Sequence, residues 1–148
     1  MVRSIAMADK TMQADNTTQT DAAACQCQAA PKLIFACSGA ADVGCITDQA
    51  ARQLTRLGLG KMFCLAGIGG RVSGIMASTE AASAVLVIDG CPLDCAKKTM
   101  ENAGFHKFAY LRLSDLGMEN GRTPVTDESI SGVVQAAKQL LAEAALAG

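Results

Sequence analysis

The sequence has few aromatic residues, a single histidine and no long apolar run. Its 148 residues include four Phe, one Tyr and no Trp, and the 13 basic and 14 acidic side chains nearly cancel. This composition disfavours nucleic-acid binding, which relies on a basic patch interleaved with stacking aromatics. The longest apolar runs, such as Ala84 to Ile88, are far shorter than the roughly 20 residues of a membrane helix. We therefore expect neither a nucleic-acid partner nor a membrane partner.

Cysteine, by contrast, is abundant, with seven residues in the chain. An odd number cannot pair completely within one chain, and Met1 to Lys10 lacks the apolar region of a secretory signal. We therefore expect a cytoplasmic protein with reduced thiols. In that compartment clustered cysteines act as metal ligands or redox groups more often than as structural bridges.

The first 31 residues differ in composition from the rest of the chain. Residues 11–28 are rich in Thr, Gln, Asp and Ala and contain no aromatic or β-branched apolar residue. Such a segment buries too little apolar surface to offset the entropy lost on ordering. Pro31 marks the predicted boundary between a disordered tail, residues 1–31, and one domain, residues 32–148.

Within that domain, short apolar segments alternate with amphipathic ones. The pattern predicts strands at 33–36, 62–66, 84–88 and 107–113, and helices at about 43–57, 75–82, 92–103 and 126–144. Pro92 is expected at the first position of the third helix, and residues 67–74 are expected to form a glycine-rich turn. With right-handed crossovers, this order predicts a three-layer α/β domain, Rossmann-like or flavodoxin-like, with a mostly parallel four-stranded sheet. The pattern leaves the strand order open.

Four of the cysteines follow three successive predicted strands. Cys37, Cys64 and Cys91 stand at or near strand ends, and Cys95 is expected one helical turn beyond Cys91 on the same face. Because the carboxyl ends of parallel strands form the working edge of such a sheet, we expect these thiols to converge. Four cysteines are a common ligand set for zinc, and helix N-termini after Cys37 and Cys91 suit the charge of bound thiolates. The sequence therefore predicts a zinc site made of Cys37, Cys64, Cys91 and Cys95.

Three motifs make the chain similar to a known family. The segments Cys37-Ser38-Gly39, residues 65–69 (LAGIG) and residues 89–98 (DGCPLDCAKK) resemble the DGC-domain family of zinc-binding proteins. The family is named after Asp-Gly-Cys, here Asp89-Gly90-Cys91, and the resemblance extends from about Lys32 to Leu141. It implies zinc binding by four cysteines that match Cys37, Cys64, Cys91 and Cys95. It implies no established biochemical activity, so an enzyme is not the favoured expectation.

Polar residues near these cysteines are candidates for supporting roles. Ser38 and Asp89 are candidates to orient the thiols by hydrogen bonds. Asp94 is a further candidate, although a first-turn acid that interacts with the helix dipole is the simpler interpretation. A small anionic or polar ligand can also be envisaged at the end of the fourth strand, next to Arg112, Ser114 and Asp115.

Two alternatives to a stable zinc site remain open. A thiol redox protein would use Cys91 and Cys95, with the thiol pKa of Cys91 lowered at a helix N-terminus. A metal or metalloid transfer or sensing protein would use Cys25 and Cys27 as a delivery arm, although two exposed tail cysteines are the simpler interpretation. An unidentified protein partner is compatible with each alternative. Cys45 is expected to pack as a small apolar side chain.

Other sites are disfavoured. The segment 37–43 lacks the arginine of an anion-binding phosphatase loop, and its Asp42 would repel an anion. Residues 67–72 carry Val72 where a dinucleotide-binding motif has its third glycine, and they follow the second strand rather than the first. His106 is expected at the surface.

Overall fold

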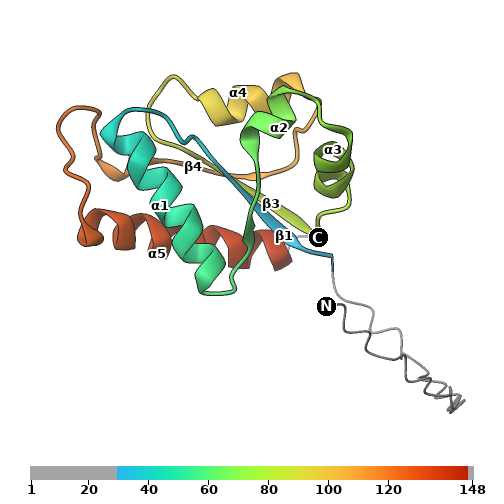
Figure 1. Cartoon of the computed structure of the whole chain (residues 1–148). Helices are drawn as coiled ribbons and strands as arrows, with labels where there is room; N and C mark the ends of the chain where they lie inside the picture. The colour runs from blue at the N-terminus through green and yellow to red at the C-terminus, as the bar shows by residue number, and fades with distance from the viewer. Residues whose placement is uncertain (1–29, 147–148) are drawn as a thin grey trace, which may run out of the picture.

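The computed structural model describes residues 30–146, so the predicted tail, residues 1–31, lies outside the described residues except for Ala30 and Pro31. Strands and helices alternate along the described chain (Figure 1). In chain order the elements are β1 (Lys32–Ala36), α1 (Asp42–Arg56), β2 (Lys61–Met62), α2 (Leu65–Gly69), α3 (Ser73–Glu80), β3 (Ala84–Asp89), α4 (Cys95–Asn102), β4 (Ala109–Arg112), the 3-10 helix η1 (Leu113–Leu116) and α5 (Asp127–Leu146).

The strands form one parallel sheet in the order β2-β1-β3-β4. The central strands β1 and β3 pair along five positions, from Lys32 opposite Ala84 to Ala36 opposite Ile88. Both strands are nearly continuous apolar runs, as a strand covered on both faces requires. The predicted α/β class with a parallel four-stranded sheet is confirmed, and the structure supplies the strand order.

Helices cover both faces of the sheet, as Figure 1 shows. Side chains alternate along each strand, so Ile34 and Ile88 pack against α1 and α5, whereas Phe35 and Val87 face the layer that contains α4. In α1 the buried stripe includes Ile46, Ala50 and Leu54. The small side chain of Ala50 lets the helix lie close to the sheet. Such close packing allows a core to form with few aromatic residues.

The strand order places a topological switch point at the middle of the sheet. The chain leaves β1 toward β2 on one side and leaves β3 toward β4 on the other, so β1 and β3 flank the topological switch point. Ligands of open parallel sheets bind outside the carboxyl ends of the strands at this point. The backbone N–H of Cys37 donates a 2.9 Å hydrogen bond to the carbonyl of Ile88 across it.

The second predicted strand is wrong beyond Met62. Residues 65–69 form helix α2, and the predicted glycine-rich turn at 67–74 contains the end of α2 and the start of α3. Gly67 is required by packing, because a Cβ at this position would lie 2.1 Å from Cδ1 of Ile75. Gly67 thus permits close approach of the two helices rather than a reversal of the chain.

The predicted start of the third helix at Pro92 is also wrong, because α4 begins at Cys95. The N-cap residue Asp94 has a left-handed backbone with φ of 55°, so residues 91–94 form a turn. Leu93, which lies within the predicted helix at 92–103, is in this turn and is 67% exposed. Cys91 therefore precedes the helix and does not share a helical face with Cys95.

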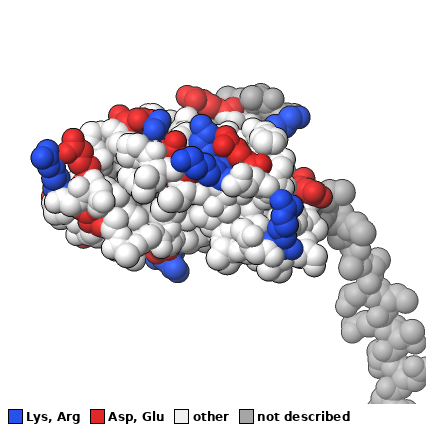
Figure 2. Space-filling view, turned by 90° about the horizontal axis from the view of Figure 1, so that it is seen from above, with Lys and Arg blue, Asp and Glu red and all other residues white. Residues whose placement is uncertain are grey.

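The surface carries charges of both signs. On the face seen in Figure 2, Lys and Arg side chains lie next to Asp and Glu side chains rather than in separate regions. Among the described helices, none is both long enough and apolar enough to span a bilayer.

Candidate metal centre

The four cysteines of the predicted site all follow strands or begin helices at the carboxyl edge. Cys37 follows β1, Cys64 is the N-cap of α2, Cys91 lies in the turn after β3, and Cys95 is the first residue of α4. All four are free thiols. Cys37 and Cys91 are half-buried, whereas Cys64 and Cys95 are exposed.

Cys37 occupies the switch point between β1 and β3. Burial raises the pKa of its thiol, and the nearby charges of Asp89 and Cys95 raise it further. Hydrogen bonds from the backbone N–H groups of Gly39 and Gly90 act in the opposite direction by stabilising the thiolate. The effect of burial on the Cys37 thiol therefore outweighs that of the backbone amides.

Gly90 lies close to helix α1, where a larger residue would meet the helix backbone. A Cβ at this position would lie 3.0 Å from backbone atoms of Val43 in α1. The glycine of the Asp89-Gly90-Cys91 motif is therefore required by close packing of the β3 end against α1.

Asp89 is a buried carboxylate that caps helix α4. It is 1% exposed and accepts hydrogen bonds from the backbone N–H groups of Ala96 at 2.8 Å and Lys97 at 2.9 Å. These amides belong to the first turn of α4, where the helix leaves N–H groups without internal partners. Asp89 therefore fixes the position at which Cys95 begins the helix.

Asp94 lies between the last two cysteines and is held by strand β4. The Tyr110 hydroxyl donates a 2.8 Å hydrogen bond to Asp94 Oδ1, and Arg112 Nη1 lies 3.6 Å from the same oxygen. The interpretation of Asp94 as a first-turn acid is wrong, because its side chain makes no cap hydrogen bond and turns toward β4. Burial and the bond to Asp94 raise the pKa of Tyr110 strongly.

Tyr110 and Thr47 were not identified from the sequence. Tyr110 also lies 3.3 Å from Asp89 Oδ2 and below the ammonium of Lys97, which is 5.1 Å from the ring centroid. The Thr47 hydroxyl donates a hydrogen bond to the carbonyl of Cys37. Tyr110 could have been found from the alternation of residues 109–112, because it pairs with the buried Val87 of β3. A threonine inside a helix gives no comparable indication.

The remaining candidate residues have other partners. Ser38 donates its hydroxyl hydrogen bond to Asp48 of α1. Arg112 Nε lies 3.4 Å from Asp115 Oδ1 without hydrogen-bond alignment, and Ser114 is half-buried in η1. Cys45 is half-buried on α1 and His106 is exposed. Cys25 and Cys27 lie outside the described residues.

The side chains as placed do not form a closed metal shell. Within residues 30–146, no three Cys, His, Asp or Glu side chains are grouped so that they could hold a metal ion. Cys91 packs against the core on the α1 and α5 side, whereas Cys37 packs on the opposite side of the sheet. The donor chemistry fits zinc, because thiols and thiolate-stabilising amides are both present. A four-thiolate site therefore requires side chains at this edge to reorient.

The fold and this edge define a small α/β domain whose cysteines follow successive parallel strands. The family model described as the DGC domain matches residues 33–137, and the chain belongs to this family. It is also similar to the anaerobic and virulence modulator AnvM of Pseudomonas aeruginosa, with 33% identity over 87 residues. That alignment covers 59% of this chain and 66% of the relative, just under two thirds of its length. No solved structure matches the chain.

Proposed function

We propose that this protein binds one zinc ion through Cys37, Cys64, Cys91 and Cys95. The observation that carries the proposal is the position of four free thiols at the carboxyl edge of one sheet, three after β1, β2 and β3 and one at the start of α4. A ligand set drawn from these elements would tie the ends of β1, β2 and β3 to the start of α4. Zinc held in this way contributes to folding free energy, because the unfolded chain has no assembled site.

The position of Cys91 disfavours the thiol redox alternative. The redox hypothesis relied on Cys91 at a helix N-terminus, and Cys91 precedes α4 by four residues. Zinc displaces the thiol protons when it binds, so the affinity for zinc falls as the pH falls.

The relative from Pseudomonas aeruginosa supports a regulatory setting. That relative is named an anaerobic and virulence modulator. We place this chain in the same setting, as a cytoplasmic zinc protein that acts on an unidentified protein partner. Metal transfer through Cys25 and Cys27 remains the alternative for the same site.

Native mass spectrometry of protein purified without added zinc tests the proposal, because it counts metal and disulfides together. We expect about one equivalent of zinc, lost on replacing Cys37 or Cys95 by Ser. Cys45→Ser is the matched control and should retain the metal, since Cys45 lies on α1 outside the ligand set. A metal-free protein with a disulfide between Cys91 and Cys95 would overturn the proposal in favour of redox chemistry.

Stability provides a second test of the same site. Chelation should lower the melting temperature of the wild-type chain and of Cys45→Ser. It should leave the melting temperature of Cys37→Ser unchanged, because that variant has no metal to lose. An equal response of all three chains would contradict zinc binding at these cysteines.

A further inference from the structure

A pocket with a volume of about 630 Å³ opens between α1 and α2 at the carboxyl end of β2. We propose that it binds a small carboxylic acid with an apolar body. The inference goes beyond zinc binding, because its main contacts come from residues outside the cysteine set. The volume lies within the roughly 300–1,000 Å³ of typical small-molecule sites.

One wall of the pocket is apolar. It is formed by Met62, Phe63, Leu65 and Ala66, which lead from β2 into α2. The Phe63 ring packs edge-on against the buried Phe35, with ring centroids 6.1 Å apart and planes at 86°. This wall is therefore anchored to the core and suits the hydrocarbon part of a ligand.

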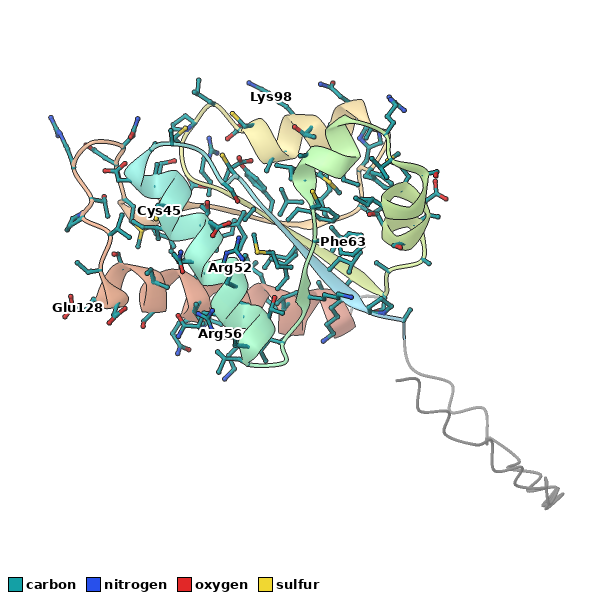
Figure 3. All side chains as sticks on the ribbon, in the orientation of Figure 1. Cys45, Arg52, Arg56, Phe63, Lys98 and Glu128 are labelled. Atoms are coloured by element: carbon teal, nitrogen blue, oxygen red, sulfur yellow. The ribbon has the colours of Figure 1, made fainter. Side chains whose placement is uncertain are left out.

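The opposite wall is polar and comes from α1. Arg52 Nε donates to Asp48 Oδ2 at 2.6 Å, Arg52 Nη2 donates to Oδ1 at 3.3 Å, and Ser38 donates to Oδ1 at 2.9 Å. The Asp48 side chain is 18% exposed and that of Arg52 is 55% exposed. The Asp48 carboxylate thus fixes the plane of the guanidinium, and it lines the pocket beside it. Figure 3 shows Arg52 on α1 and Phe63 on the segment between β2 and α2, the two elements that border the pocket.

Arg52 keeps N–H groups for a ligand. Its hydrogen bonds among residues 30–146 use Nε and Nη2 only, both to Asp48, and Nη1 has no partner there. A guanidinium held in one plane recognises a planar carboxylate through parallel N–H bonds. Because the Asp48 carboxylate offsets the charge of the single Arg52, this wall suits a monoanionic carboxylate better than a phosphate dianion.

The pocket also reaches the metal centre. Cys64 lines it together with Gly69 and Thr99, so a bound acid lies against the Cys64 thiol. Occupancy should therefore slow alkylation of Cys64 and leave alkylation of Cys45 unchanged. This readout needs no zinc.

Calorimetric titration of the full chain with 4-phenylbutyrate tests the pocket, with the neutral 4-phenylbutan-1-ol as the matched ligand. In the presence of a chelator, we expect one saturable site with a Kd on the order of 1 mM or below for the acid. The alcohol should bind at least about tenfold more weakly, because it cannot pair with the guanidinium. Equal binding of the two compounds, or no saturation by about 10 mM acid, would overturn the proposal.

Paired variants locate the binding. Arg52→Gln should weaken binding of the acid about tenfold, whereas Arg56→Gln, one turn further along α1, should not. Ala66→Phe should fill the pocket and abolish binding, whereas Ala77→Phe on the exposed surface of α3 should leave it intact. Binding that survives both Arg52→Gln and Ala66→Phe would overturn the assignment. Because every titration is run without metal, failure of zinc binding and failure of the pocket are separate outcomes.

Discussion

The Tyr110 hydroxyl on β4 hydrogen-bonds to Asp94 Oδ1 at 2.8 Å, and Asp94 has a left-handed backbone with φ of 55°. Strand β4 thereby holds the residue that precedes Cys95 in a conformation that costs energy for most side chains. The contact with the neighbouring strand β4 therefore shapes the turn between Cys91 and Cys95 together with the sequence of the turn itself.

Two substitutions at Asp94 separate the backbone cost from the hydrogen bond. Asp94→Ala and Asp94→Gly both remove the bond from Tyr110, but only glycine adopts the left-handed conformation without strain. We expect Asp94→Gly to be more stable than Asp94→Ala by about 1 kcal/mol. Urea denaturation of both variants measures the difference, and equal midpoints would show that the turn relaxes in the alanine variant.

Replacement of Asp89 should be among the most destabilising changes at the sheet edge. Asp89→Ala leaves the N–H groups of Ala96 and Lys97 without their acceptor in a buried place. We expect a loss of about 2–3 kcal/mol in the free energy of unfolding. Asp127→Ala, in the exposed first turn of α5, is the control and should cost less than about 1 kcal/mol. Similar losses for the two variants would contradict the capping role of Asp89.

The glycine of the Asp89-Gly90-Cys91 motif gives a packing prediction. In Gly90→Ala the new methyl group meets the Val43 backbone at 3.0 Å, so we expect a loss of about 1–3 kcal/mol. Gly74→Ala is the matched control, because Gly74 lies in α3 with nothing within 4 Å of a Cβ. It should be neutral or stabilising by up to about 1 kcal/mol. Thermal unfolding compares the two, and a neutral Gly90→Ala would show that α1 can shift.

Cys37 should react slowly with alkylating reagents in the metal-free folded protein. Its raised pKa leaves less thiolate at neutral pH, and burial limits access. We expect its alkylation rate to keep rising with pH beyond the point at which Cys37 of the urea-unfolded chain levels off. Mass spectrometry of peptides after timed alkylation gives both profiles. Because the folded state binds this proton more tightly, the group also lowers stability as the pH rises above the ordinary thiol range. Coincident profiles would contradict the burial argument.

The sequence predicted the layers of the fold better than its turns. Apolar runs such as 84–88 and the stripe of α1 show their periodicity directly, so the parallel sheet and its helices followed from them. Pro92 is a good first helical residue and so predicts too early a start for α4, whereas the observed start depends on capping by Asp89 and on the contact between Asp94 and Tyr110 of β4. Likewise, Gly67 was interpreted as a turn residue, although its role is contact with Ile75.

For the candidate site, the shared edge of the sheet was predictable but the directions of the side chains were not. The four cysteines could be assigned to one edge because parallel strands place their carboxyl ends together. The opposite packing of Cys37 and Cys91 could not be predicted, since it depends on side-chain direction after the last paired residues of β1 and β3.

Strand β2 consists of Lys61 and Met62 and pairs with β1 alone, while β3 is paired on both sides. Cys64 therefore follows the shortest strand of the sheet, where local opening breaks few contacts. Amide protection should be lower here than in β1 and β3. Of the four cysteines proposed to hold zinc, Cys64 would therefore be the one whose backbone opens most easily, and the reason would be the short length of β2.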